Sequence, residues 1–306
     1  MQRTLLVHIG THKTGTSSVQ SYIRKHAEKL KECGVFVPTS GTLGPDSGHH
    51  NIAWQIRNDL RFSAEAGGVQ ELIREMASSS EKITVISSED FEYLSQYPHE
   101  LKNFDETINA AGYATSYIVY FRNINDYSSS LYAELITSGF TEDYLAIERA
   151  IRKDGYVRFN GDWYYEFRYD RFVESWERIV GSKIRGFSYD DAVAGIGLLP
   201  SFLKLIGASN SLIDESRNAP LLNTRIEKLE YERSARMKLG KELEKALQQI
   251  ADLTARTISQ EAEVESERAQ RISLDIAFRM STSWRLTAPL RKTIEVARAI
   301  KSTVLG

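Results

Sequence analysis

The feature that most constrains the fold of this chain is the stretch at residues 4–20, TLLVHIGTHKTGTSSVQ. Residues 5–9 are apolar and β-prone, as expected for a buried parallel strand. A turn rich in Gly, Thr and Ser follows at residues 10–18, and an apolar pattern with helical spacing begins directly after it. A strand, a tight turn and a helix in this order aim backbone N–H groups and a helix N-terminus at an anion. The sequence therefore predicts a phosphate-binding loop in an α/β domain.

The side chains of this loop suit a phosphate. Lys13 supplies a positive charge, and Gly10 and Gly15 permit a tight turn and a close approach of the backbone. Four hydroxyl groups add hydrogen-bond donors, those of Thr14, Thr16, Ser17 and Ser18. The loop differs from the nucleoside-triphosphate motif, because there a Lys-Ser/Thr pair directly follows the second glycine. The alternative interpretation is an ordinary strand-to-helix turn that is rich in Gly and Thr.

The run KTGTS at residues 13–17 resembles the nucleotide loop of the PAPS-dependent sulfotransferases, where PAPS is 3′-phosphoadenylyl sulfate. The loop of that family carries a Lys-Ser/Thr-Gly-Thr-Ser/Thr run and grips the 5′-phosphosulfate end of PAPS. The resemblance implies that Lys13 and the residues up to Ser18 bind this part of the donor.

A second motif follows the strand expected at residues 116–121. Arg122 stands at the end of this strand, and Ser130 follows in the next helix. An arginine there offers a forked pair of donors to a phosphate, and a serine about two turns along the helix can reach the same group. Sulfotransferases have this spacing at their 3′-phosphate site, so the resemblance implies that Arg122 and Ser130 hold the 3′-phosphate. The alternative is an ion pair between Arg122 and Asp126, with the serines solvated.

One part of that 3′-phosphate site has no clear counterpart. Many sulfotransferases complete the site with a Gly-rich basic element near the end of the domain, and only Arg217-Asn218 is a candidate for it here.

The candidate base is a carboxylate after the strand expected at residues 82–86. Ligands bind at the carboxyl ends of strands in open α/β sheets, so Glu89 reaches the same edge as the loop. A carboxylate there can accept the proton of an acceptor hydroxyl. The resemblance supports this role, because several carbohydrate and tyrosine sulfotransferases use a glutamate base. The alternative is that this segment caps the short helix that follows.

A histidine is the second candidate for catalysis. His49 and His50 close a Gly- and Ser-rich loop at residues 39–50, and one imidazole there is expected to reach the acceptor. His50 is this candidate, with capping of the next helix as the alternative. Adjacent histidines on a helix cannot face one point, and no Cys or Glu stands nearby at ligand spacing, so we expect no metal site.

The resemblance to the bacterial carbohydrate sulfotransferases covers roughly residues 4–215. It implies transfer of the sulfuryl group of PAPS to a hydroxyl of a carbohydrate acceptor, in a surface polysaccharide or a glycolipid. Lys13 and the loop would stabilise the negative charge that develops on the leaving phosphate. Two other functions remain open from the sequence: a P-loop-type small-molecule kinase, and a non-catalytic scaffold that assembles partners through its C-terminal helix.

The composition is that of an ordinary globular protein, with 42% hydrophobic and 26% charged residues. A formal net charge of −2 gives no reason to expect nucleic acid as a partner. The single cysteine, Cys33, excludes an internal disulfide and fits a reducing compartment. We see no signal peptide and no apolar run near the ~18 residues that a membrane span needs. These features favour a cytoplasmic location.

The pattern of charges and prolines divides the chain into three parts. We expect an α/β domain at residues 1–218, a charged coiled-coil helix at residues 219–280 and a tail at residues 281–306. The domain is expected to be a P-loop-type, three-layer structure with a parallel sheet flanked by helices. Heptad positions a and d can be assigned across residues 222–278, which favours a homo-oligomer. A single charged helix that lies on the domain is the alternative.

The tail begins with the string STSWRLTAPLR at residues 281–291. It resembles a tail that follows coiled segments in bacterial glycosyltransferases and related surface-polysaccharide enzymes. The last helix expected in the tail is amphipathic and basic, which suits contact with a membrane surface or a partner. A peripheral position at the inner face of the membrane is therefore one expectation for this protein.

Overall fold

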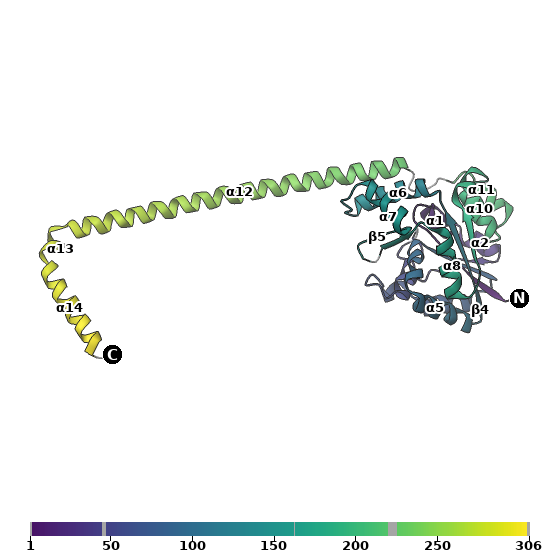
Figure 1. Ribbon diagram of the computed structural model, residues 1–306, viewed down its shortest axis with the longest axis horizontal. Coiled ribbons are helices and arrows are strands. Elements are labelled where there is room, and N and C mark those ends of the chain that lie inside the picture. The colour runs from purple at the N-terminus through teal and green to yellow at the C-terminus, as the bar shows by residue number, and fades with distance from the viewer. Residues whose placement is uncertain (1, 45–46, 162, 220–224, 305–306) are drawn as a thin grey trace. The chain divides into compact units, whose positions relative to one another are not determined.

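A computed structural model describes residues 2–44, 47–161, 163–219 and 225–304 (Figure 1). The chain forms two compact units, Met1–Glu230 and Tyr231–Gly306. The first unit is an α/β domain and the second consists of helices.

The domain is built on a sheet of five parallel strands in the order β2-β3-β1-β4-β7. The strands are β1 (Arg3–Ile9), β2 (Val35–Phe36), β3 (Ile83–Ser88), β4 (Tyr113–Phe121) and β7 (Ile184–Ser188). The central strand β1 pairs with β3 on one side and β4 on the other, so that Val7 lies opposite both Ile86 and Tyr117. All five strands therefore end at the same edge of the sheet.

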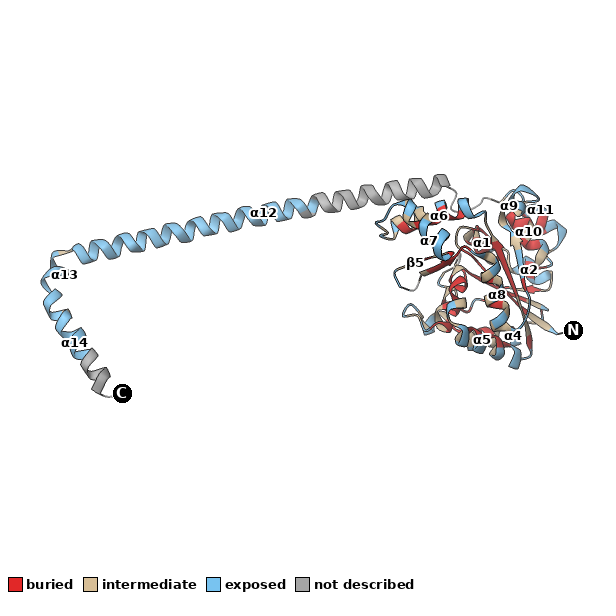
Figure 2. Cartoon of the chain, viewed as in Figure 1, coloured by how far each residue is buried: buried red, intermediate tan, exposed pale blue. Residues whose placement is uncertain are grey.

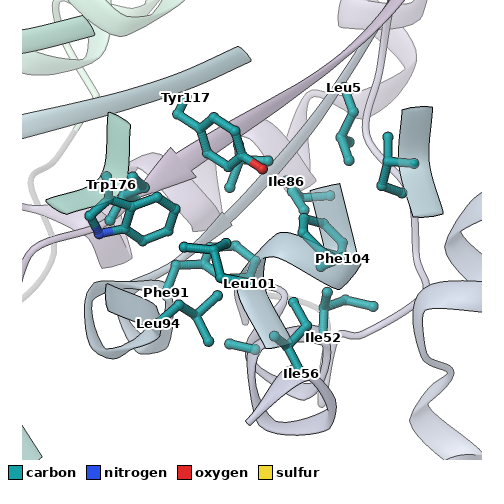
Figure 3. Close-up of a cluster of buried hydrophobic side chains, with 14 of the residues drawn as sticks. Leu5, Ile52, Ile56, Ile86, Phe91, Leu94, Leu101, Phe104, Tyr117 and Trp176 are labelled. Carbon is teal, nitrogen blue, oxygen red and sulfur yellow. The ribbon is translucent and has the colours of Figure 1, made fainter. Parts of the chain in front are cut away.

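Helices cover both faces of the sheet, which confirms the predicted three-layer arrangement. Alternate residues of β1 point to opposite faces, so that Leu5 belongs to one core cluster and Leu6 to the other. The first cluster lies under α3 (His50–Ile56), α4 (Val69–Ser78), α5 (Pro98–Ala110), α8 (Tyr169–Val180) and the 3-10 helix η2 (Glu89–Gln96). Figure 3 shows Trp176, Tyr117 and Leu101 in this cluster, and full burial of an apolar side chain such as Leu101 contributes about 1.5–3 kcal/mol.

The second cluster packs beneath the helices on the other face of the sheet. They are α1 (Thr16–Lys25), α2 (Ala27–Glu32), α9 (Tyr189–Ala194), α10 (Leu198–Leu205) and α11 (Asn210–Ser216). The sequence predicts one helix from Val19 to Leu30, whereas the structure divides it at His26. The imidazole of His26 stacks on Tyr22, and its Nδ1 atom lies 2.9 Å from the Tyr22 carbonyl oxygen.

An aromatic subdomain forms the third core cluster. The antiparallel hairpin of β5 (Tyr156–Phe159) and β6 (Trp163–Glu166) packs with α6 (Ile124–Thr137) and α7 (Tyr144–Asp154). The sequence predicts that the aromatic side chains here are mostly core, but it does not reveal the hairpin, whose strands are only four residues each. A short 3-10 helix, η1 (Ala64–Ala66), lies in the loop after α3.

The second unit begins within α12 (Arg225–Met280), and its described residues continue through α13 (Thr282–Leu286) and α14 (Ala288–Val304). The long helix and the break after residue 280 agree with the helical pattern of the sequence. Nearly every side chain described in this unit is exposed (Figure 2). Among the described residues, no helix is long and apolar enough to cross a membrane.

Candidate active site

The candidate site residues meet at the edge where the strands end. The loop at residues 10–15 follows β1, Glu89 follows β3, Arg122 follows β4, and Tyr189 follows β7. After β1 the chain continues toward β2, and after β4 toward β7, so these two adjacent strands lead to opposite sides of the sheet. Such a switch point is where open α/β sheets bind their ligands.

The loop is held in an unusual backbone conformation. Gly15 caps α1 with φ of 71°, and Lys13 has φ of 64°, both in the left-handed region. A Cβ atom at Gly10 would lie 2.4 Å from the Thr16 side chain, and one at Gly15 would lie 2.5 Å from Leu198. Close packing therefore favours glycine at both positions, and the left-handed backbone favours it at Gly15 as well.

The buried hydroxyl groups mainly fold the loop. Thr14 donates to the Thr11 carbonyl at 2.6 Å, and Thr11 donates to the Tyr120 carbonyl at 2.7 Å. The Thr16 hydroxyl lies 3.4 Å from both Thr14 Oγ1 and the Thr11 carbonyl. The N–H groups of Thr16 and Ser17 begin the first turn of α1 and suit an anion, whereas the Ser18 N–H donates to the Gly15 carbonyl at 3.0 Å. The donors expected from Thr14 and Thr16 side chains thus point inward, while Ser17 is half-buried and Ser18 is buried.

The ammonium group of Lys13 is paired with a carboxylate. Its Nζ atom lies 2.7 Å from Glu134 Oε2, with 18% of the Lys13 side chain and 29% of the Glu134 side chain exposed. Glu134 lies on α6, one turn after Ser130. The sequence analysis did not identify this partner.

Arg122 links the two sequence motifs. Its Nη1 atom donates to Ser130 Oγ at 3.2 Å and to the Lys13 carbonyl oxygen at 3.1 Å. Its guanidinium lies over the Tyr189 ring, 5.4 Å from the centroid. The Nε atom of Arg122 is buried without a hydrogen-bond partner among the described residues. Within the described residues, Arg122 does not form the ion pair with Asp126 that was the alternative interpretation.

A cavity opens beside Arg122, between the ends of β4 and β7. Phe121 and Tyr169, which stack with ring centroids 4.3 Å apart, and Phe187 contribute aromatic walls. Carboxylates such as Asp126 and Asp191 line its polar side. The cavity therefore offers ring faces and hydrogen-bond acceptors next to a guanidinium.

Glu89 faces Gln20 and His50. Gln20 Nε2 donates to Glu89 Oε2 at 2.8 Å, and His50 Nε2 lies 3.9 Å from the same oxygen. The Glu89 side chain remains 27% exposed. Ser88 is the residue that caps η2, accepting from the Asp90 N–H at 3.1 Å, so Glu89 is not the capping residue.

His50 is the first residue of α3 and does not cap it. Its Nδ1 atom lies 2.9 Å from Asp90 Oδ2 and 3.0 Å from Ser88 Oγ. Burial opposes protonation of His50, but the hydrogen bond to Asp90 and the charges of Glu89 and Asp90 outweigh it, and the pKa is raised. The His50 imidazole thus lies between the carboxylates of Glu89 and Asp90.

His49 anchors the loop that carries His50. The Ser87 N–H donates to His49 Nδ1 at 3.1 Å, and His49 Nε2 lies 3.1 Å from the Pro38 carbonyl oxygen. Burial lowers the pKa of His49 to about 4, which fits a neutral ring with these two bonds. The two adjacent histidines therefore have different roles, one structural and one at the site.

His12 of the loop pairs with the buried carboxylate of Glu92. The sequence analysis did not identify this pair. Glu92 Oε2 accepts from the His12 backbone N–H at 2.9 Å and lies 2.8 Å from His12 Nδ1. Burial disfavours the charged imidazole, but the hydrogen bond to Glu92 and the nearby carboxylates raise the pKa of His12 to about 9.

Two remaining expectations concern a metal and Arg217. Across the described ranges, no group of three or more His, Cys, Asp or Glu side chains is arranged to hold a metal ion. Arg217 ends α11 and donates through Nε to Asp214 at 3.2 Å. No contact between Arg217 and Arg122 or Ser130 is found within the described part of the chain.

No protein-family model and no curated protein matches this chain. Among solved structures, it is similar to a sulfotransferase from Alicyclobacillus acidocaldarius, with 15% sequence identity and a TM-score of 0.38. The match covers 68% of this chain and 83% of that one. A likeness of this extent does not establish a shared function.

Proposed function

We propose that this protein is a sulfotransferase that moves the sulfuryl group of PAPS to a hydroxyl of a carbohydrate acceptor. The observation that carries the proposal is the position of Arg122. One guanidinium contacts both the phosphate-type loop, at Lys13, and Ser130 of the second motif. This contact supports one anion site with two neighbouring positions, which would suit a ligand that carries phosphates at both ends of a nucleoside.

The residues present fit such a donor. The N-terminus of α1 and Lys13 would hold the 5′-phosphosulfate, and Arg122 with Ser130 would hold the 3′-phosphate. The buried Nε–H group of Arg122 has no hydrogen-bond partner among the described residues, so it is available to donate to a phosphate. The aromatic walls of the adjacent cavity suit a nucleobase. PAPS would supply a sulfuryl group bonded to a phosphate leaving group.

Glu89 is the proposed general base. Its carboxylate would take the proton of the acceptor hydroxyl as the acceptor oxygen bonds to sulfur and the sulfur–oxygen bond to the phosphate breaks. Gln20 orients this carboxylate through a 2.8 Å hydrogen bond. The Nδ1 atom of His50 is already engaged by Asp90 and Ser88, and 16% of its side chain is exposed against 27% for Glu89, which favours Glu89 over His50 for this step. Lys13 would stabilise the charge that develops on the leaving phosphate.

The acceptor and partners are proposed on other grounds. A surface polysaccharide or a glycolipid suits the resemblance of the tail to that of polysaccharide enzymes. We propose further that α12 associates with α12 of a second copy, and that the basic helix α14 touches the inner face of a membrane from the cytoplasm.

Calorimetric titration with PAP, the product of the donor, tests the proposed function. We expect tight binding of PAP without added metal and much weaker binding of ADP and AMP, which lack the 3′-phosphate. Arg122→Ala should abolish the preference for PAP. Arg185→Ala, which removes an exposed arginine on β7, is the matched control and should leave it unchanged. Equal binding of all three nucleotides, or no binding, would contradict the proposal and favour a kinase or a non-catalytic scaffold.

A further inference from the structure

Lys13, the one lysine of the loop, already has an anionic partner. Glu134 Oε2 lies 2.7 Å from Lys13 Nζ, and both side chains are largely withdrawn from solvent. An ion pair of this kind is screened less than one at the open surface. Any anion that reaches the loop must therefore compete with Glu134 for the ammonium group.

The position of Glu134 on α6 connects this pair to the second motif. Ser130 and Glu134 are four residues apart and lie on the same face of the helix. Ser130 contacts Arg122, and Glu134 contacts Lys13. One face of α6 thus touches both cationic side chains that the proposed function assigns to the donor.

We propose that Glu134 is a positioning residue that holds Lys13 as its counter-ion until an anionic donor displaces it. This inference rests on the proposed function, because the displacing group is the 5′-phosphate end of the nucleotide. The carboxylate of Glu134 repels that phosphate and competes for its lysine. The chain therefore binds the nucleotide less tightly than its cationic residues alone would permit, and it keeps Lys13 at a defined place when the site holds no nucleotide.

The same pairing separates the role of Glu134 from that of Glu89. Glu134 contacts the lysine that the proposed function places against the leaving phosphate. Glu89 accepts instead from the neutral amide of Gln20. Glu134 is therefore assigned to the donor side of the site and Glu89 to the acceptor side.

The test is the affinity of the full-length chain for PAP, measured by calorimetry. Glu134→Gln keeps the size of the side chain and removes its charge, so we expect PAP to bind roughly fivefold more tightly. Glu134→Ala should change the affinity in the same direction. Glu142→Gln, which removes an exposed carboxylate just beyond α6, is the matched control and should change it by less than about twofold.

A double-mutant cycle shows whether the effect acts through Lys13. In a Lys13→Ala background, Glu134→Gln should give a clearly smaller gain in affinity, because the competition for the ammonium group is gone. Unchanged or weaker PAP binding in Glu134→Gln, with normal binding by the wild type, would overturn this inference alone. An undiminished gain in the Lys13→Ala background would overturn it as well. Absence of PAP binding in the wild type would overturn the proposed function and this inference together.

Discussion

Arg122 donates a hydrogen bond to the backbone carbonyl of Lys13 at 3.1 Å, which ties the end of β4 to the loop after β1. The bond uses the main chain of Lys13, while its side chain pairs with Glu134. The shape of the loop and the charge that it presents therefore depend on different atoms of the same residue. This separation makes it feasible to remove the charge and keep the loop.

Lys13→Ala should abolish sulfuryl transfer without unfolding the domain. The substitution removes the charge proposed to stabilise the leaving phosphate, and the loss of such a group lowers the rate by about 10²–10³-fold. The carbonyl that accepts from Arg122 remains, so the thermal unfolding midpoint should stay close to that of the wild type. Activity assays and circular dichroism check both parts. Transfer near the wild-type rate would remove Lys13 from the mechanism, whatever the midpoint.

Glu89→Gln should lower the rate of transfer by about 10²–10⁴-fold, as expected for loss of a general base. The affinity for PAP should change little, because Glu89 is assigned to the acceptor side. A rate assay paired with PAP titration makes this measurement. His50→Asn is the comparison: it should lower the rate less than Glu89→Gln does. A larger loss in His50→Asn would identify the histidine as the base, and no loss in either variant would exclude both residues as the base. No transfer by the wild type would support a scaffold.

Two buried histidines predict a loss of stability in acid. Burial lowers the pKa of His8 from an ordinary value of 6.5 to about 3. The pKa of His49 is lowered to about 4, with burial as the largest cause. Between pH 6.5 and about 4, the unfolded chain thus binds more protons than the folded chain does. Stability is then complete above pH 6.5 and falls as the pH drops, by about 1.4 kcal/mol per pH unit for each proton. Urea unfolding between pH 4 and 7 measures this slope.

The control for this slope is an exposed histidine. His49→Gln should reduce the slope by about one proton, whereas His99→Gln, on the surface of α5, should not change it. An unchanged slope in His49→Gln would show that His49 is not kept neutral. His12 acts in the opposite direction: its pKa is raised to about 9, so its contribution is complete below pH 6.5 and lost as the pH rises through 9.

The helix α12 is predicted to self-associate through its heptad seam. Ile250 and Leu253 occupy positions a and d, and each is about 60% exposed in a single chain. Light scattering of the full chain should give the mass of an oligomer, and the double variant Ile250→Glu and Leu253→Glu should give a monomer. Ile258→Glu places the same charge at position b, outside the seam, and should leave the mass unchanged. A monomeric wild type would contradict the prediction.

The tail is predicted to bind anionic membranes. Leu290 and Ile294 are exposed on α14, and the same helix carries the basic residues Arg291, Lys292 and Arg298. Vesicles rich in anionic lipid should retain the full chain better than a chain that ends at residue 280, and neutral vesicles should retain neither. Equal retention of the two chains by anionic vesicles would contradict this proposal.

The sequence by itself determined the parts of this protein that depend on local order. Strand, loop and helix follow one another at residues 4–20, and the hydrophobic period of each segment determines which face it buries, so the three-layer sheet could be predicted. The eight-residue separation of Arg122 and Ser130 was also a local signal, because two turns of one helix bring the serine back toward the strand end. The long helix α12 follows from a segment that has no proline and one glycine, Gly240.

Only the tertiary structure decided which distant side chains meet. His12 and Glu92 are 80 positions apart, and their pairing depends on β1 and β3 lying side by side. The Lys13–Glu134 pair likewise depends on how α6 packs over the loop. Such contacts leave no periodic trace in a single sequence, since side chains of either charge are equally compatible with the local helix or turn. The physical reason is that a hydrophobic period in the sequence indicates which side chains are buried, whereas an ion pair requires two side chains to be close in space. Distant segments become close only once the sheet has formed.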